Sequence, residues 1–312
     1  MLYADLKMKI AVIGVGSLGQ HHARIYSQMQ DVEFFAVCDS DEKQAKKIAK
    51  NVNTQYFSDY KELIGKVDAT SIVVPTPLHY QVAKDFLEAG VHCLVEKPIT
   101  DNVALAEELL KIANDKNLVL QIGHIERFNT AVIEARKYIK EPKFIEAQRL
   151  GPYNPRAAHI GVVMDLMIHD IDIILTLVNS KIVQMDVIGA KVLSQTEDIA
   201  NVRLKFENGC VANISASRIS IDKFRKIRLF QDDTYISLDY AGQNLKIYQK
   251  KSEVVTSMSD IKIIKPKLKT EEPLKKELEH FVNCVKNGKT PLVTGEHGRD
   301  ALEVAIEIIK KL

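Results

Sequence analysis

Short apolar runs alternate with amphipathic helical segments over the first 123 residues of the chain. The apolar runs have the length and β-branched composition of buried strands and lie at 9–15, 32–38, 69–74, 91–95 and 118–122. Helical patterns separate them, at 18–29, 41–51, 78–89 and 101–116. Strands that alternate with helices of this length predict βαβ units and a parallel sheet with both faces covered. We therefore expect a doubly wound α/β domain at the start of the chain.

The pattern changes after about residue 141. A long, mostly apolar helix is predicted at 160–178. Strand-like runs then dominate, at 143–149, 183–193, 200–206, 210–219, 225–230, 234–239 and 244–249. Two of them are separated by Glu-Asn-Gly at 207–209, which is typical of a tight hairpin. Strands that follow strands predict a mostly antiparallel sheet and an α+β second domain.

These patterns suggest two domains, 1–123 and 124–312. Two helices close the second one, at 273–287 and from 298 to the end, and the final helix is free to pack back on the first domain. Residues 252–270 are rich in lysine and poorly periodic, so we expect an exposed strand and loop there. Met8 begins a fresh strand pattern, and residues 1–7 are expected to be a dispensable extension.

Charge and cysteine content narrow the class of protein. Lys and Arg number 43 and Asp and Glu 41, so a net charge of +2 gives no general attraction to nucleic acid. The four cysteines have no metal-site spacing and indicate reduced thiols in the cytoplasm. The longest stretch without a charged side chain, 69–83, contains two prolines and is too short for a membrane span. The chain is expected to bind neither a membrane nor nucleic acid.

A glycine-rich turn follows the first strand and opens the first helix. Residues 14–19 are Gly-Val-Gly-Ser-Leu-Gly. In such a turn the first glycine permits the bend, the second lets backbone N–H groups approach a pyrophosphate, and the third lets the helix pack on the strand. The helix N-terminus adds partial positive charge. The turn predicts a dinucleotide site made by Gly14, Gly16, Ser17, Leu18 and Gly19.

Asp39 ends the second strand, 20 residues after the last of these glycines. A carboxylate in this position accepts hydrogen bonds from the adenosine ribose hydroxyls and repels a 2′-phosphate. Asp41 and Glu42 add negative charge, and no arginine is nearby to reverse the preference. The sequence thus favours NAD over NADP. The alternative is a glycine turn without a ligand, with Asp39 as a helix cap.

Two further strand ends carry proline. The strand at 69–74 runs into Pro75, Thr76 and, three residues later, His79, whereas the strand at 91–95 runs into Glu96, Lys97 and Pro98. Ligands of open α/β sheets bind at the carboxyl ends of the strands, so these residues are candidates for cofactor contacts. A lysine held beside a proline has a defined position and can bind a substrate hydroxyl. A solvated Lys97 next to a structural proline is the alternative.

The helix at 160–178 carries acidic and basic groups on an apolar background. Asp165, His169 and Asp172 lie at i, i+4 and i+7, on one stripe, and Asp170 lies about 100° around the helix. Buried polar groups need partners, so the stripe meets a ligand or another polar wall. Asp165 can orient His169 as a general base. A structural polar network, or a metal site built on Asp165 and His169, is the alternative.

Taken together, these segments resemble the glucose–fructose oxidoreductase/inositol dehydrogenase family (Gfo/Idh/MocA) of NAD(P)-dependent sugar dehydrogenases. The resemblance rests on the motifs at 14–19, Asp39, 75–79, 96–98 and 165–169, in that order along nearly the whole chain. It implies a Rossmann domain followed by a domain with a large, mostly antiparallel sheet, whose open face makes dimer or tetramer contacts. It also implies a catalytic set of Lys97, Asp165 and His169 without a metal, and allows a cis Lys97–Pro98 bond.

Two more segments narrow the resemblance. Residues 123–129 (GHIERFN) and 149–153 (RLGPY), followed by DLMIHDID, resemble bacterial enzymes that oxidise the 3-hydroxyl of UDP-N-acetylglucosamine to a ketone. A partner aminotransferase can convert that ketone to an amine. The candidate substrate contacts are then Asp165, His169, Arg127, Asn129, Arg149 and Arg156. For the arginines, a structural ion pair is an equally weighted alternative.

The resemblance implies an NAD-dependent sugar dehydrogenase in which His169 takes the hydroxyl proton, Asp165 binds or orients, and Lys97 contacts the reacting hydroxyl and the nicotinamide ribose. Other substrates remain open within the same fold: inositol, a free hexose or another nucleotide sugar. Outside this class, the alternatives are a non-catalytic NAD-binding redox sensor and a zinc-dependent hydrolase.

Overall fold

The computed structural model of the chain describes residues 7–155 and 158–312. It forms two compact units. Unit 1 comprises the chain up to Ile125 together with Leu274–Leu302, and unit 2 comprises Glu126–Pro273 together with Glu303–Leu312. The first unit thus also contains Leu274–Leu302, a segment that the sequence pattern placed in the second domain. Within the described residues, no helix has the length and apolar character that a membrane span requires.

Unit 1 is built on a six-stranded parallel sheet in the order β3-β2-β1-β4-β5-β6. Its strands are β1 (Met8–Ile13), β2 (Val32–Cys38), β3 (Gln55–Phe57), β4 (Ala69–Ile72), β5 (His92–Glu96) and β6 (Leu120–Gly123). The chain winds outward from β1 in one direction and from β4 in the other, so the order reverses between these two strands. Dinucleotides bind at such a switch point. The expected doubly wound parallel sheet is confirmed, and β3 is an additional strand too short to show a period.

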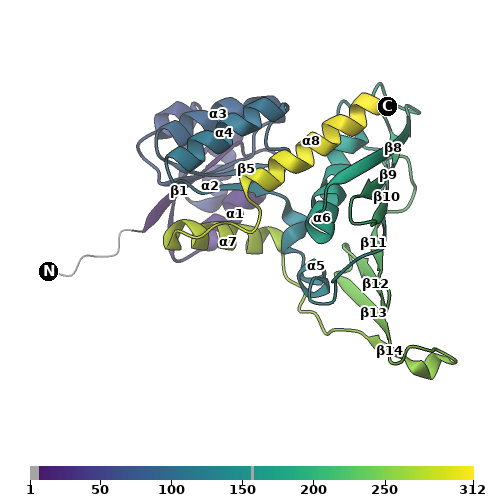
Figure 1. Cartoon of the computed structure of the whole chain (residues 1–312). Helices are drawn as coiled ribbons and strands as arrows, with labels where there is room; N and C mark the ends of the chain where they lie inside the picture. The colour runs from purple at the N-terminus through teal and green to yellow at the C-terminus, as the bar shows by residue number, and fades with distance from the viewer. Residues whose placement is uncertain (1–6, 156–157) are drawn as a thin grey trace. The chain divides into compact units, whose positions relative to one another are not determined.

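Helices cover both faces of this sheet. They are α1 (Gly19–Gln28), α2 (Glu42–Val52), α3 (His79–Glu88), α4 (Val103–Asp115) and α7 (Pro273–Asn287). Helices α3 and α4 lie on one face, and α1 and α7 lie on the other (Figure 1). Tyr26 from α1, Ile48 from α2 and Phe281 from α7 share one core cluster with the apolar side chains of β1. That shared core explains why α7, far along the chain, belongs to unit 1.

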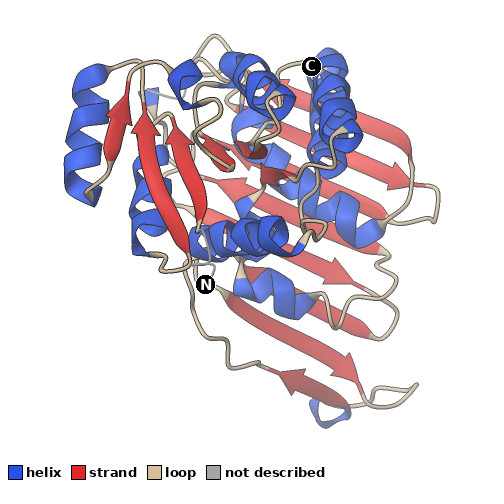
Figure 2. Ribbon diagram, turned by 90° about the vertical axis from the view of Figure 1, so that its left-hand side faces the viewer, coloured by secondary structure: helices blue, strands red, loops and turns tan. Residues whose placement is uncertain are grey.

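Unit 2 contains an eight-stranded sheet in the order β14-β13-β12-β11-β7-β10-β9-β8, whose strands lie side by side in Figure 2. The strands are β7 (Phe144–Leu150), β8 (Ile182–Ala190), β9 (Ile199–Phe206), β10 (Val211–Ser217), β11 (Phe224–Phe230), β12 (Thr234–Asp239), β13 (Asn244–Lys250) and β14 (Ile261–Ile264). Only the β7–β10 pair is parallel among these neighbours. Gly209, at φ +84°, makes the predicted turn between β9 and β10. The mostly antiparallel sheet is confirmed.

Alternation of buried and exposed residues gives this sheet two different faces. Along β9 the pattern is strictly exposed–buried, and β7, β10 and β12 alternate in the same way. Helices α5 (Thr130–Ala135) and α6 (Ile168–Val178) pack on the buried face. The opposite face of the sheet remains half exposed in the chain alone. Helix α8 (Gly295–Lys311) divides between the units at residue 302.

Several boundaries differ from the sequence expectations. The helix expected at 160–178 begins as a π-helical turn, Val163–Met167, and continues as α6. The strand expected at 183–193 ends at Ala190, because the next N–H groups turn to bind the Asp198 carboxylate. Helix α5 was not anticipated. The remaining short elements are 3₁₀ turns at Tyr60–Leu63, Thr76–Leu78, Ile125–Phe128 and Met258–Asp260.

Candidate functional site

A cavity of about 640 Å³ lies at the carboxyl edge of the parallel sheet, beside the β1/β4 switch point. The predicted cofactor residues that line it are Gly14, Gly16, Ser17, Asp39 and Pro75. Ser58, Asp59 and Tyr60 line it as well. They follow β3, which is too short to show a period, so the sequence pattern did not point to them. The size of the cavity is that of an ordinary cofactor site.

The three glycines of the turn have three different surroundings. Gly14 has φ +84°, and a Cβ there would come within 2.6 Å of the Val73 carbonyl oxygen. A Cβ on Gly19 would fall 1.8 Å from the Gly14 carbonyl oxygen, so only glycine lets α1 start this close to the turn. A Cβ on Gly16 would meet no protein atom within 4 Å. The open space above Gly16, next to the exposed Ser17 and Leu18, is where a pyrophosphate fits.

Asp39 braces the turn from the neighbouring strand. Its carboxylate accepts the Val15 N–H at 2.8 Å and the Asp41 N–H at 3.0 Å. The side chain also lines the cavity together with Asp59. Two carboxylates in the lining favour ribose hydroxyls and oppose a 2′-phosphate. The cavity therefore fits NAD better than NADP.

His79 links the two proline-containing strand ends. Its ring nitrogens lie 2.8 Å from the carbonyl oxygens of Pro98 and Val74, and the residue is only 1% exposed. Burial lowers the pKa of His79. Thr76 begins the 3₁₀ turn between Pro75 and this histidine. The ring of His79 is thus committed to holding the loops after β4 and β5 together, whereas Pro75 lies on the cavity wall.

Glu96 supports the turn that presents Lys97. Its carboxylate accepts the Lys97 N–H at 3.2 Å and lies 3.2 Å from His22 Nε2. A Cβ on Gly123 would fall 2.7 Å from the Glu96 carboxyl group, so the glycine makes room for it. The Lys97–Pro98 peptide bond is cis. Lys97 itself is half-buried at the carboxyl end of β5.

In unit 2, Asp165 lies within the π-helical turn and the half-buried His169 follows on the first turn of α6. Such turns are rare and are frequently found at functional sites. The start of the helix is anchored by Glu197, whose carboxylate accepts the Val163 N–H at 3.2 Å. A Cβ on Gly161 would fall 2.0 Å from that carboxylate, so glycine is needed for this contact.

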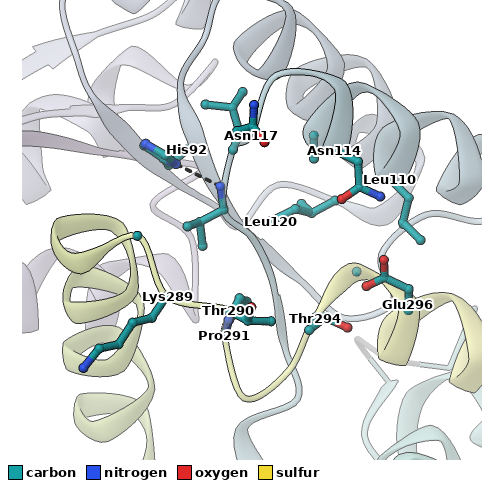
Figure 3. A pocket seen from close by; sticks show the side chains of 15 residues that line it. His92, Leu110, Asn114, Asn117, Leu120, Lys289, Thr290, Pro291, Thr294 and Glu296 are labelled. Carbon is teal, nitrogen blue, oxygen red and sulfur yellow. Dashed lines mark hydrogen bonds between the residues drawn. The ribbon is translucent and has the colours of Figure 1, made fainter.

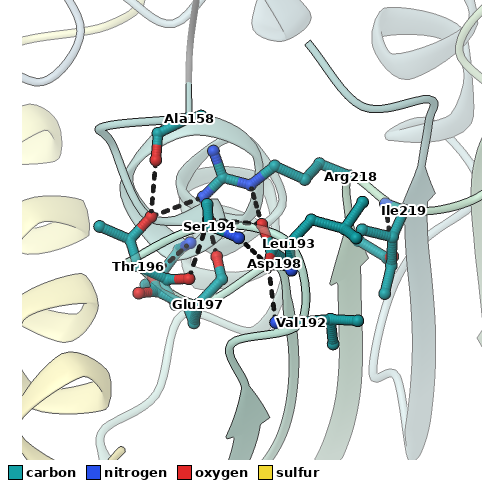
Figure 4. Close-up of polar contacts among 11 residues, drawn as sticks. Ala158, Val192, Leu193, Ser194, Thr196, Glu197, Asp198, Arg218 and Ile219 are labelled. Atoms are coloured by element: carbon teal, nitrogen blue, oxygen red, sulfur yellow. Dashed lines mark hydrogen bonds and ion pairs between the residues drawn. The ribbon is translucent and has the colours of Figure 1, made fainter. Parts of the chain in front are cut away.

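The loop that carries Glu197 is held by a buried ion pair between Asp198 and Arg218 (Figure 4). Asp198 accepts the N–H groups of residues 192–194 and the Ser194 hydroxyl. Burial opposes its ionisation, but these hydrogen bonds hold the pKa of Asp198 below its ordinary value. Arg218 donates to the Glu197 carbonyl oxygen at 2.8 Å. The network fixes the loop on which the helix start depends.

Two of the arginines predicted to bind substrate form ion pairs with carboxylates of the same unit. Arg127 is 2% exposed and donates from Nε and Nη2 to both oxygens of Asp172, at 2.6 and 2.7 Å. Asp172 therefore faces Arg127 instead of joining Asp165 and His169. Asn129 caps α5 through the Ala131 N–H and donates to the Tyr240 carbonyl oxygen. The pair between Arg127 and Asp172 is the structural ion pair that was the alternative to substrate binding for the arginines.

Arg149 is likewise 2% exposed. It donates to both oxygens of Asp170 and to Glu126 at 2.9 Å. Burial opposes its charge, but the two carboxylates raise the pKa of Arg149 above its ordinary value. Arg156 lies outside the described residues.

Two other cavities are relevant. One, of about 400 Å³, lies within unit 2 and is lined by Asp165, Arg149, Tyr153, Lys223 and Arg225, among others. The other lies at the amino ends of β5 and β6, between His92 and the α7–α8 connection (Figure 3). That second cavity is at the edge of the sheet opposite to the one that binds cofactors. Among the described residues, no three His, Cys, Asp or Glu side chains gather in a way that could hold a metal ion.

Known proteins resemble the chain along nearly its whole length. Residues 8–124 match the family model described as oxidoreductase family, NAD-binding Rossmann fold, and residues 147–311 match its C-terminal alpha/beta domain. UDP-N-acetylglucosamine 3-dehydrogenase of Acidithiobacillus ferrooxidans is 34% identical over 308 residues, which is 97% of this chain and 96% of the relative. A scyllo-inositol 2-dehydrogenase of Bacillus subtilis is 25% identical over 96% of this chain and 92% of its own length.

A solved structure of UDP-N-acetylglucosamine 3-dehydrogenase from Acidithiobacillus ferrooxidans superimposes with a TM-score of 0.91, at 34% identity, over 98% of this chain and 97% of the other. The family resemblance seen in the motifs is thereby confirmed, as are the Rossmann domain and its cofactor. The chain belongs to the Gfo/Idh/MocA oxidoreductase family and is an NAD-binding dehydrogenase.

Proposed function

We propose that the enzyme oxidises the 3-hydroxyl of UDP-N-acetylglucosamine to a ketone, with NAD as the oxidant. The observation that carries this proposal is the 34% identity, over 97% of the chain, to a UDP-N-acetylglucosamine 3-dehydrogenase. The inositol dehydrogenase relative is 25% identical. This similarity supports oxidation of a ring alcohol as the general reaction, but it does not favour a particular substrate. Oxidation of an inositol is the second candidate.

The proposed catalytic residues are Lys97 from unit 1 and Asp165 and His169 from unit 2. His169 takes the proton of the reacting hydroxyl as a general base, because an imidazole ring nitrogen can accept a proton. Asp165 binds the sugar or orients the imidazole, and Lys97 stabilises the alkoxide character that develops on the oxygen. The turn at Gly14, Gly16 and Ser17 would hold NAD, and the bound cofactor would supply the acceptor for the hydride that leaves the sugar carbon. The proton and the hydride together account for the two-electron oxidation.

The structural support for this assignment lies in how each residue is held. Glu96 and His79 define the turn that presents Lys97. Glu197 and the Asp198–Arg218 pair define the start of the helix that presents Asp165 and His169. Catalytic groups need such fixed supports, since small displacements lower the rate severely. Two of the remaining candidates from the sequence, Arg127 and Arg149, are held by carboxylates and are better assigned to the support than to the substrate.

Single substitutions test these roles. We expect Lys97→Ala and His169→Ala each to lose at least about a hundredfold in kcat, as is typical for a lost acid–base or charge-stabilising group. NAD binding, measured by calorimetry, should persist in His169→Ala because its pyrophosphate site in unit 1 is intact. Lys116→Ala, an exposed lysine at the end of α4, serves as the control. Normal turnover in both catalytic variants would contradict the mechanism.

We further propose a cellular setting for the enzyme. All four cysteines are buried and unpaired, as suits the reducing cytoplasm. The half-exposed face of the large sheet is proposed to pair with a second copy, which makes the enzyme a homodimer or homotetramer. The 3-keto product is a substrate for transamination, so an aminotransferase is the expected partner in the pathway.

A further inference from the structure

The cavity in unit 2 lies on the face of the sheet that carries α6. Its walls come from the end of β7 and the turn after it, from the π-helical turn, and from the start of β11. Asp165, a proposed catalytic residue, is on one of these walls. A ligand that reaches Asp165 therefore shares a space of about 400 Å³ with the side chains of β7 and β11.

Arg225 lies directly opposite Arg149 in the β7–β11 register, so the two side chains leave the sheet on the same face. The neighbouring pairs on that face, Ile227 with Ala147 and Leu229 with Ile145, are buried. Arg225 is exposed because the cavity opens over this end of the sheet. Like charges opposite each other on adjacent strands destabilise a sheet unless something neutralises them.

The cationic side chains of the cavity differ in their partners. Arg149 is neutralised by Asp170 and Glu126, and Arg218 by Asp198. For Arg225 and Lys223, the structure records no ion pair with any residue in the described ranges 7–155 and 158–312. Two positive charges thus line the cavity without an ion-pair partner among the described residues, and a bound anion would compensate them.

We propose that Arg225 and Lys223 form the diphosphate-binding part of a nucleotide-sugar site. This inference rests on the proposed function, which it deepens. Guanidinium and ammonium groups bind phosphate oxygens through charge-assisted hydrogen bonds, and their two charges match a diphosphate. An inositol or a free hexose carries no charge and would leave both cations unpaired. Tyr153, 36% exposed on the same cavity, offers a ring face to a base.

Binding of UDP, which lacks the reacting sugar, isolates this part of the site. Calorimetric titration of UDP into the full-length enzyme should show saturable binding that Arg225→Gln or Lys223→Gln weakens by about tenfold or more. Arg225→Lys should retain part of the affinity. Arg228→Gln is the matched control, because Arg228 lies on the same strand but on the other face, 3.4 Å from Glu146. Equal affinity for UDP in wild-type and Arg225→Gln protein, or none in either, would overturn the proposal.

Kinetics separate this proposal from the proposed function. With UDP-N-acetylglucosamine, Arg225→Gln should raise KM by about tenfold or more while kcat changes little. If UDP binding depends on Arg225 but UDP-N-acetylglucosamine is not oxidised, the diphosphate site stands and the proposed substrate is wrong. If Arg225→Gln oxidises UDP-N-acetylglucosamine with wild-type KM, the substrate stands and the diphosphate site is wrong.

Discussion

Gly16 and Gly19 lie three residues apart in the same turn, yet they are glycine for different reasons. Gly19 is required by the protein itself, because a Cβ would collide with the Gly14 backbone. Gly16 has no protein atom near its missing Cβ. We propose that its reason is the ligand, because a bound pyrophosphate would need the backbone this close. The motif predicted the turn, but only the structure separates these two requirements.

Alanine at each position tests the distinction. Gly19→Ala should lower both the stability of the protein and its NAD affinity, because the backbone of the turn must move. Gly16→Ala should leave the free energy of unfolding within about 0.5 kcal/mol of wild type. It should still weaken NAD binding by roughly tenfold, because the methyl group occupies the pyrophosphate position. Thermal unfolding without NAD and calorimetry with NAD measure the two effects. Wild-type NAD affinity in Gly16→Ala would disprove the placement of the pyrophosphate.

Arg127 is a residue whose binding partner could not be inferred from the sequence. An arginine near a predicted site suits either a phosphate or a carboxylate, and its own sequence position does not tell which. The structure supplies Asp172, 45 positions along the chain, as its bidentate partner inside unit 2. Asp172 was itself expected, with Asp165 and His169, to meet a ligand or another polar wall. Both residues serve the packing of α6, because a buried charge requires an opposite one.

Removing one partner of this pair should be costly. We expect Arg127→Met to lower the free energy of unfolding by roughly 3–5 kcal/mol, since it leaves the Asp172 carboxylate buried and uncompensated. The double variant Arg127→Met/Asp172→Leu should recover most of that loss. Denaturant unfolding of the three proteins measures this. A stable Arg127→Met enzyme with a raised KM for substrate would instead assign Arg127 to substrate binding.

At the scale of elements, α7 brings a carboxyl group into the interior of unit 1. Glu277 is fully buried, and neither of its carboxyl oxygens has a hydrogen-bond partner among the described residues. Burial and then the charge of Glu96 raise the pKa of Glu277 well above its ordinary value of 4.5. Because Glu96 supports the Lys97 turn, this carboxyl group links the packing of α7 to the neighbourhood of a proposed catalytic residue.

The raised pKa makes stability depend on pH. Below pH 4.5 both the folded and the unfolded chain hold the Glu277 proton. As pH rises above that value, the unfolded chain releases the proton and the folded chain keeps it, so stability falls by about 1.4 kcal/mol per pH unit until the folded pKa is reached. Glu277→Gln should therefore become more stable than wild type as pH increases from 5 to 8. The exposed Glu279→Gln on the same helix is the control. Parallel pH profiles for wild type and Glu277→Gln would contradict a protonated Glu277.

Elements with a strong period were predictable from the sequence. The strands β1, β2, β4, β5 and β6 and the alternating strands of unit 2 appear within a few residues of their expected positions. The three-residue β3 and the six-residue α5 are too short to carry a period. The π-helical turn could not be foreseen, because it depends on Glu197, which approaches the helix start from a distant loop. The same loop explains why β8 ends at Ala190.

At the scale of the whole molecule, the exposed face of the large sheet carries a ladder of aromatic rings. Phe144, Phe230, Tyr235 and Tyr248 lie on four adjacent strands, with successive ring centroids 5.6, 4.9 and 5.4 Å apart. All four are half-buried in the chain alone. Aromatic side chains are enriched at the cores of subunit interfaces. This ladder is the part of the sheet on which the proposed self-association depends.

Light scattering coupled to size-exclusion chromatography should give a mass of two or four chains for the wild-type enzyme. Tyr235→Glu, which places a charge in the middle of the ladder, should shift the protein toward the monomer. Lys116→Glu, a charge change at an exposed position at the end of α4 in unit 1, should leave the mass unchanged. A wild-type monomer at micromolar concentration would exclude this role for the sheet.

The proposed catalytic set is divided between the two units, with Lys97 in one and Asp165 and His169 in the other. The order of the motifs along the chain was enough to suggest the family, and the structure accounts for how each motif is held. Two observations support the proposed nucleotide-sugar substrate: the cationic side chains of the unit 2 cavity and the similarity to a UDP-N-acetylglucosamine 3-dehydrogenase.

Formation of NADH, followed at 340 nm, tests this central claim most directly. Purified enzyme and NAD are incubated with UDP-N-acetylglucosamine and, in parallel, with free N-acetylglucosamine, myo-inositol, scyllo-inositol and glucose. An aminotransferase that consumes the 3-keto product is added to each reaction, with an amino acid as the amino donor, so that an unfavourable equilibrium does not hide turnover. We predict NADH with the nucleotide sugar alone. NADH with an uncharged polyol or hexose, and none with UDP-N-acetylglucosamine, would contradict the account.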